Sequence, residues 1–174
     1  MVASKLSLLS VPFDGIQQRI QEIGTTVIRY LNLPKIPKEI LNNLNYNFDQ
    51  YLFKSNYLNG AYKWSDDFNQ QVDSWCKQNI CDTMHWGFQF MNSNIVAHKD
   101  VGTEVKLTYL IAAGGDNVHT NFFEDDKTTI THSFVIPLHQ WHVLYANKYH
   151  SVEGIEPGQT RFSLTGRVFP LPID

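Results

Sequence analysis

The stretch MHWGFQFM, residues 84–91, has the alternating pattern of a β-strand. Large apolar side chains occupy every second position and leave the same face of an extended backbone: Met84, Trp86, Phe88 and Phe90. The segment VKLTYLIAA, residues 105–113, repeats this period, with one face made of Val105, Leu107, Tyr109 and Ile111. Two neighbouring segments with a two-residue period predict a sheet with an apolar face.

Further strands are predicted downstream, where short apolar segments are separated by Gly, Pro, Asn and Asp. They cover residues 129–136, 141–145 and 160–169. In the last segment Phe162, Leu164 and Val168 lie on the face opposite Arg161, so we expect these three apolar side chains on the covered side of the sheet.

The chain before residue 84 has a helical period instead. The first predicted helix ends at Pro34 and has the apolar stripe Ile16, Ile20, Ile23, Val27 and Leu31. The second follows Pro37, with the stripe Ile40, Leu44 and Phe48. In the third, Ser65 is the expected cap, Asp66 and Asp67 favour the positive end, and the stripe is Phe68, Val72 and Trp75. Helices followed by strands predict an α+β fold in which the helices pack on one outer face of a sandwich or barrel.

Length and composition narrow the class of protein. A chain of 174 residues fits one domain, and 43% hydrophobic residues with 13% aromatics exclude disorder. The net charge is −3, whereas proteins that bind a nucleic-acid backbone usually have a basic surface, so nucleic acid is not an expected partner. Two cysteines are too few for a disulfide scaffold or a zinc ribbon, and no apolar window is long enough for a membrane span. We therefore expect a cytoplasmic protein without a membrane partner.

His98 and Asp100 stand two residues apart, so both side chains leave the same face of extended backbone while Lys99 leaves the other. One imidazole and one carboxylate are two of the three ligands in a facial triad for iron(II). With 7 His and 17 Asp plus Glu, chance alone gives about 0.7 pairs at this spacing, so the pair predicts a metal site only together with a further ligand.

That further ligand is His150, which follows an apolar strand and a short polar turn in LYANKYHSVEGI, residues 144–155. Arg161 comes eleven residues later on the next predicted strand, and Ser163 shares its face. A guanidinium and a hydroxyl on one face can hold one carboxylate. This pair is a receptor for the far end of a dicarboxylate.

The sequence resembles the iron(II)- and 2-oxoglutarate-dependent oxygenases in the order, spacing and strand context of three motifs: His98-Lys99-Asp100, His150 and Arg161-Phe162-Ser163. The resemblance covers about residues 84–169. It implies a single domain over residues 1–174, in which a mainly helical support over residues 1–83 packs on one sheet of a double-stranded β-helix, the jelly-roll or cupin-like core, over residues 84–169.

The resemblance also implies the site residues and the co-substrates. His98, Asp100 and His150 would be the catalytic ligands of Fe(II), and Arg161 and Ser163 would bind 2-oxoglutarate, with dioxygen as the second co-substrate and ascorbate as an optional reductant. The segment LTYLIAAGG, residues 107–115, resembles prolyl hydroxylase-like members, in which a tyrosine precedes a Gly-Gly turn. This suggests Tyr109 as another 2-oxoglutarate contact.

The activity implied is hydroxylation of an amino-acid side chain, free or in a peptide or protein. A nucleobase-demethylating dioxygenase is an alternative, because Arg167 has the same parity as Arg161 and resembles the second arginine of DNA-alkylation repair dioxygenases. A jelly-roll domain that only binds a small ligand is another. A cupin dioxygenase would need a second histidine in place of Asp100. The other histidines are expected to be structural or exposed, with His119 nearest to the segment that borders the substrate pocket in relatives.

Overall fold

The computed structural model describes residues 27–42, 44, 62–65, 70–82, 84–103 and 105–168. The helices in these ranges are α2 (Lys38–Asn42) and α4 (Gln70–Asn79). The strands are β1 (Ile28–Leu31), β2 (Tyr62–Ser65), β3 (His85–Met91), β4 (Ile95–His98), β5 (Val105–Ala112), β6 (His119–Phe123), β7 (Ile130–Val135), β8 (Trp141–Tyr145), β9 (His150–Glu153) and β10 (Arg161–Val168).

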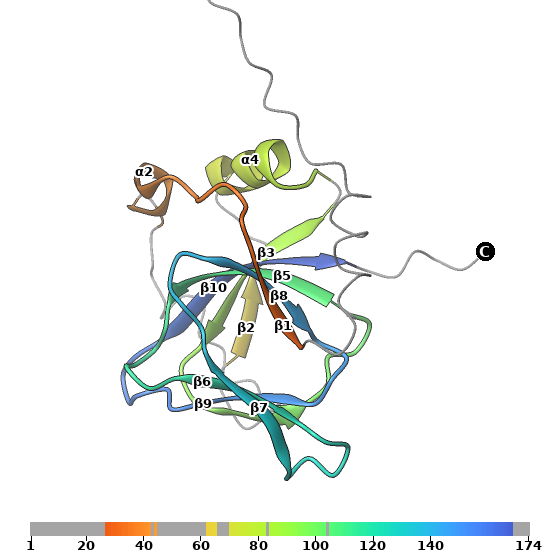
Figure 1. Ribbon diagram of the computed structural model, residues 1–174. Coiled ribbons are helices and arrows are strands. Elements are labelled where there is room, and N and C mark those ends of the chain that lie inside the picture. Colours follow the sequence, from red (N-terminus) through yellow and green to blue (C-terminus); the bar gives the residue numbers. More distant parts are fainter. Residues whose placement is uncertain are drawn as a thin grey trace, which may run out of the picture.

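The strands form two antiparallel sheets. The larger sheet has six strands in the order β1-β8-β5-β10-β3-β2, and the smaller has four in the order β4-β9-β6-β7. From β3 to β6 the chain crosses from one sheet to the other at every strand, as in a jelly-roll sandwich. Figure 1 shows the helices beside the six-stranded sheet, on the side away from the four-stranded sheet. The predicted sandwich of antiparallel strands is confirmed.

The main apolar core lies between the six-stranded sheet and the helical segments, outside the sandwich. Alternate residues of four strands supply its sheet side, among them Trp86, Phe88, Leu107, Tyr109, Trp141, Val143, Phe162 and Leu164. The helical side contributes Ile36, Leu41, Val72, Cys76 and Ile80. A hydrogen bond from Trp141 Nε1 to the Pro34 carbonyl oxygen (2.8 Å) joins the two layers. Because strand residues alternate, the opposite face of the sheet is left to line the space between the sheets.

The predicted helical first half is not supported. Ile28–Leu31, which lies within the first predicted helix, forms strand β1 and pairs with β8, and Ser65, the expected helix cap, is the last residue of strand β2. Pairing with an existing sheet supplies hydrogen bonds that outweigh a local helical period. Helices α2 and α4 overlap the second and third predicted helices. The remaining positions named there, which include residues 1–26, Phe48 and 66–68, lie outside the described residues.

The strands predicted after residue 84 agree closely with β3, β5, β7, β8 and β10. Phe162 and Leu164 lie in the covered core, as expected, whereas the side chain of Val168 is not among those that the structure describes. Cys76 and Cys81 are buried, and neither forms a disulfide. Among the described helices, none has the length and apolar character needed to cross a membrane.

Candidate metal centre

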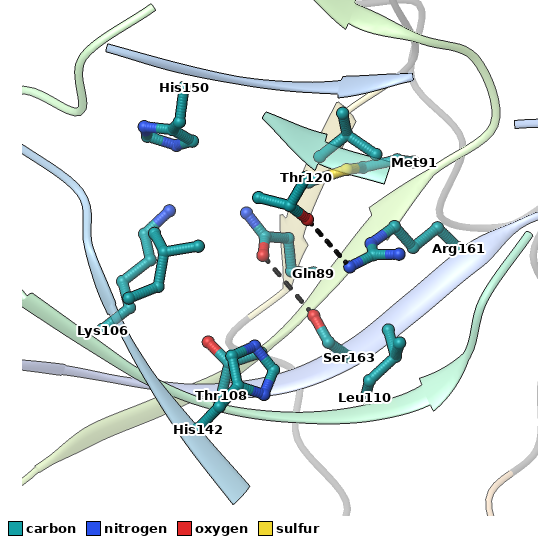
Figure 2. A pocket seen from close by; sticks show the side chains of 12 residues that line it. Gln89, Met91, Lys106, Thr108, Leu110, Thr120, His142, His150, Arg161 and Ser163 are labelled. Atoms are coloured by element: carbon teal, nitrogen blue, oxygen red, sulfur yellow. Dashed lines mark hydrogen bonds between the residues drawn. The ribbon is translucent and has the colours of Figure 1, made fainter. Parts of the chain in front are cut away.

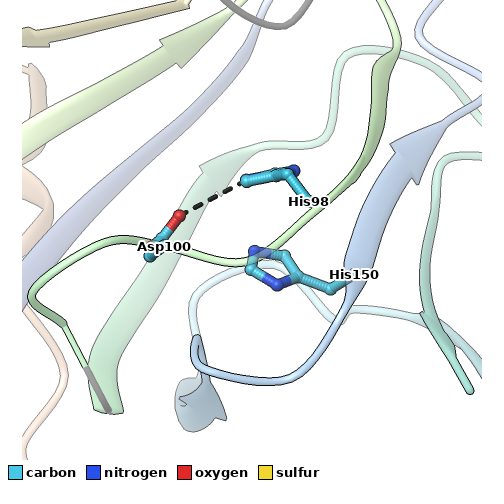
Figure 3. Close-up of side chains that lie close together, drawn as sticks. All are labelled: His98, Asp100 and His150. Atoms are coloured by element: carbon cyan, nitrogen blue, oxygen red, sulfur yellow. Dashed lines mark ion pairs between the residues drawn. The ribbon is translucent and has the colours of Figure 1, made fainter. Parts of the chain in front are cut away.

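The two histidines of the predicted triad lie directly opposite each other on neighbouring strands. His98 ends β4 and His150 begins β9, and the antiparallel register pairs these two residues. Their ring centroids are 4.4 Å apart (Figure 3). Directly opposed residues on one face of an antiparallel pair are close neighbours, so the strand register itself brings the imidazoles together.

Asp100 follows β4 and is fixed by its backbone. Its amide donates a hydrogen bond to the carbonyl oxygen of Ala146 (2.8 Å), which ties the chain after His98 to the turn that leads to His150. Asp100 Oδ1 lies 3.3 Å from His98 Nε2 (Figure 3). One potential ligand atom from each of the three residues lies within 4.8 Å of the others.

Both imidazoles are oriented for metal binding through Nε2. His98 Nδ1 lies 2.9 Å from the Val96 carbonyl oxygen, and His150 Nδ1 lies 2.8 Å from that of Lys148. A carbonyl oxygen only accepts, so each Nδ1 carries a proton and Nε2 is the ring atom left to bind a metal. Burial, followed by the charge of His98, lowers the pKa of His150 to about 4, so its ring is neutral at pH 7.

Asp100 is ionised in the same setting. Burial by itself would raise its pKa, but the hydrogen bond with His98 and the charge of Lys106 outweigh burial and lower the pKa. Two imidazoles and one carboxylate are the donor set of the iron(II) facial triad, which leaves coordination positions open. The residues present therefore fit a divalent first-row metal.

A pocket between the sheets extends from His150. Its empty volume is about 430 Å³, including its open mouth, and its walls include Lys106, Thr120, His142 and Arg161. Figure 2 shows His150 and Lys106 on one side of the pocket and Arg161 on the other. The lining residues in the described part of the chain include two cationic side chains and no carboxylate, so the pocket favours an anion.

Arg161 and Ser163 occupy this pocket as predicted from their shared parity. An Nη atom of Arg161 donates to Thr120 Oγ1 (3.3 Å), and Ser163 Oγ donates to Gln89 Oε1 (3.4 Å) (Figure 2). Burial lowers the pKa of Arg161 to about 10, so the guanidinium remains charged at neutral pH. A buried cation without a carboxylate among the pocket walls is suited to an anionic ligand.

The Gly114-Gly115 turn helps to place Arg161. Gly114 has a φ of +86°, and a Cβ atom there would lie 2.8 Å from the Arg161 backbone nitrogen. Glycine is therefore required both by conformation and by the close approach of the chain. This turn ends the segment LTYLIAAGG and packs against the start of β10. It therefore helps to fix the backbone position from which the Arg161 side chain extends.

Tyr109 is not part of this pocket, which corrects the expected 2-oxoglutarate contact. It lies on the other face of β5, is 1% exposed, and packs against Trp141 with ring centroids 4.9 Å apart. The two-residue period explains the error, because Tyr109 shares parity with the core residues Val105 and Leu107 and not with Lys106.

Two other residues of interest lie outside the pocket walls. Arg167 pairs in register with Lys106 across β10 and β5, but it does not line the pocket. His119 is half-buried in β6, with Nδ1 3.1 Å from Ser133 Oγ, and is likewise absent from the lining.

The sequence interpretation missed Lys106 and His142, both buried and both facing the pocket. Burial lowers the pKa of His142 to about 4, which keeps this ring neutral. The two-residue period of the strands could have indicated both residues. Lys106 alternates with core residues of β5, and His142 lies between the core residues Trp141 and Val143 of β8, so both side chains leave the face opposite the core.

No family model matches this sequence, and no curated protein matches it. Among the solved structures that match is an oxidoreductase of the 2OG-Fe(II) oxygenase family from Burkholderia pseudomallei, with 14% sequence identity and a TM-score of 0.39 over 87% of this chain and 77% of that chain. This likeness is too slight to assign a family.

Proposed function

We propose that this protein is an Fe(II)- and 2-oxoglutarate-dependent dioxygenase that hydroxylates an amino-acid side chain, free or in a peptide or protein. One observation carries the proposal. The ligand atoms of His98, Asp100 and His150 lie within 4.8 Å of one another, and the pocket that begins at His150 has the buried Arg161 and Ser163 on its far side. A dicarboxylate that reaches from a metal to a guanidinium fits this arrangement.

The side chains divide the work of binding. His98, Asp100 and His150 would hold Fe(II), and Arg161 and Ser163 would hold the distal carboxylate of 2-oxoglutarate through charge-assisted hydrogen bonds. With 2-oxoglutarate and dioxygen bound, the iron centre supplies the oxidation that converts a substrate C–H bond to C–OH and yields succinate and carbon dioxide. The sheets orient these groups in the space between them.

The substrate class follows from charge and from the pocket walls. The net charge of −3 does not favour a nucleic-acid backbone. Arg167, the residue that suggested a nucleobase substrate, does not line the pocket. We therefore favour an amino-acid side chain over a nucleobase.

The test is succinate formation from 2-oxoglutarate by purified protein with Fe(II), ascorbate and air, since many such enzymes turn over slowly without a prime substrate. Wild type is expected to form succinate and His98→Ala to form none. His139→Ala is a matched control, because His139 is an exposed histidine whose side chain does not line the pocket. Equal succinate formation by wild type and His98→Ala, or none by wild type with any candidate peptide or amino acid, contradicts the proposal.

The rival, a domain that only binds a small ligand, makes a different prediction for Asp100→Ala. A binding domain would keep its affinity for 2-oxoglutarate in this variant with or without metal. The proposed enzyme would lose metal and, with it, the metal-dependent part of 2-oxoglutarate binding, which titration calorimetry measures.

A further inference from the structure

Lys106 is a buried lysine next to the metal centre. It lies on the inner face of β5 and is 4% exposed, although lysine is almost never fully buried unless it is paired. Its partner is Asp100, whose Oδ2 contacts the Lys106 ammonium. Figure 2 shows the ammonium directed toward the side of the pocket where His150 lies.

The two carboxylate oxygens of Asp100 therefore have different neighbours. Oδ1 is 3.3 Å from His98 Nε2 and so faces the histidines, whereas Oδ2 contacts Lys106. An ion between the three ligands would meet one oxygen of Asp100, because the other is held by a cation.

We propose that Lys106 is a positioning residue that restricts Asp100 to one ligand oxygen and offsets its negative charge. This inference rests on the proposed function and concerns the same site. A histidine that binds a metal through its imidazole is a neutral ligand, so Asp100 and Lys106 together add a net charge of zero. A bound divalent ion then keeps its full charge of +2 for attracting an anionic 2-oxo acid. The carboxylate also leaves one more position free for that acid.

Removing the ammonium should then affect the metal and the acid in opposite directions. Lys106→Met keeps an unbranched apolar side chain but frees the second oxygen and the full charge of Asp100. The metal should bind more tightly, since it no longer competes with an ammonium, and the 2-oxo acid should bind more weakly. A purely structural lysine would weaken both, because its loss would disturb the whole pocket.

Lys99→Met is the matched control. Lys99 lies between the two ligands in sequence, but its ammonium contacts Asp125 at 3.1 Å, and its side chain is 41% exposed. This variant removes the same unit charge from a solvated position, where it is screened. Lys106→Gln is a second variant in case Lys106→Met folds poorly, because an amide still donates a hydrogen bond to Asp100.

The experiment measures Mn²⁺ affinity by titration calorimetry, followed by 2-oxoglutarate affinity at saturating Mn²⁺ without oxygen, with circular dichroism as a check of folding. In Lys106→Met we expect the Kd for Mn²⁺ to fall about tenfold and the Kd for 2-oxoglutarate to rise about tenfold, as for removal of one close charge. Lys106→Gln should show the same opposite signs with smaller changes. Lys99→Met should change neither affinity by more than about twofold.

Two results overturn the inference while the metal centre stands: unchanged affinities in folded Lys106→Met and Lys106→Gln, or weaker binding of both Mn²⁺ and 2-oxoglutarate. A wild-type protein that binds no Mn²⁺ is a different failure, since it removes the proposed function itself.

Discussion

In each of the three proposed ligands, one polar atom is held by a neighbouring group, which leaves the other polar atom to bind the metal. The Val96 and Lys148 carbonyl oxygens hold Nδ1 of the two histidines, and the Lys106 ammonium holds one oxygen of Asp100. Such partners fix the tautomer and orientation of ligands before a metal arrives. The chemistry of the site therefore depends on neighbours that supply no ligand atom.

At this scale the first prediction concerns the arginine. Arg161→Met should weaken 2-oxoglutarate binding by about 30-fold or more, or about 2 kcal/mol, because it removes one partner of a buried charge-assisted contact. Mn²⁺ affinity should be unchanged. Calorimetry without oxygen measures both constants.

Arg167→Met is the control for this prediction, since Arg167 lies on the same strand with the same parity but outside the pocket lining. An equal loss of 2-oxoglutarate affinity in the two variants would show that the pocket has been assigned to the wrong arginine.

The second prediction concerns His142, whose pKa is lowered by burial from 6.5 to about 4. Between these values the unfolded chain binds a proton that the folded protein excludes, so stability falls as pH falls from 6.5 to 4 and this contribution levels off below pH 4. From pH 7 to 5 the loss attributable to His142 is about 2 kcal/mol.

His142→Gln should lose less stability over that interval than wild type, as measured by urea unfolding with a chelator present. His150, whose pKa is shifted in the same direction, contributes an equal slope to both proteins and cancels in the difference. Identical pH dependence in wild type and variant would mean that His142 takes up its proton in the folded state.

Much of the site was accessible from spacing alone. Order and two-residue spacing predict His98, Asp100, His150, Arg161 and Ser163 as site residues. The structure places ligand atoms of the first three within 4.8 Å of one another, and His150, Arg161 and Ser163 line one pocket. Lys106 was not predicted, because a lysine in a strand usually marks a solvent face, and its burial depends on Asp100, which arrives from another sheet. For Tyr109 the family resemblance predicts a 2-oxoglutarate contact, whereas its position in the two-residue period of β5 predicts the core face on which it lies.

At the scale of elements, strand β10 has one face that packs in the core and stabilises the fold and another face that lines the pocket. Leu164 faces the outer core with no exposure, whereas its neighbour Ser163 faces the pocket. The alternation of a strand assigns these roles, since successive side chains point to opposite faces.

The third prediction tests this division. Leu164→Ala should lower the free energy of unfolding by about 2 to 5 kcal/mol through lost burial and a cavity. It should leave 2-oxoglutarate affinity, per folded molecule, nearly unchanged. Ser163→Ala should do the reverse, with weaker 2-oxoglutarate binding and an unfolding free energy within about 1 kcal/mol of wild type. Urea unfolding and calorimetry measure the pair; loss of affinity in Leu164→Ala but not in Ser163→Ala would reverse the assigned faces.

The elements that local pattern failed to predict are those made by pairing. Strand β1 has residues compatible with a helix, and its identity comes from the backbone of β8, with Ile28 opposite Leu144. Strand β6 has Thr120 and Asn121 at its centre and was not predicted, although both residues are buried between β7 and β9. Such strands depend on partners distant in sequence, which a local period does not contain.

At the scale of the whole molecule, the main core and the pocket lie on opposite faces of one sheet. The helices cover the apolar face, so the space between the sheets can hold polar side chains without loss of the principal core. This layering explains why the chain can bury Lys106, His142 and Arg161 together.

The fourth prediction follows from linkage between metal and fold. Mn²⁺ at 100 times its Kd should stabilise the folded protein by about 2.7 kcal/mol, because the ligands converge only when β4 and β9 pair in the folded chain. Urea unfolding with and without Mn²⁺ should show this increase in wild type and not in His150→Ala. An equal increase in the variant would place the binding site elsewhere.

The central claim is that His98, Asp100 and His150 share one metal ion. The most direct measurement is an anomalous difference map from crystals soaked with Mn²⁺ or, without oxygen, with Fe²⁺. We predict one strong peak bonded to Nε2 of both histidines and to one oxygen of Asp100. A map with no peak between these residues, or with the ion bound by other side chains, would contradict it.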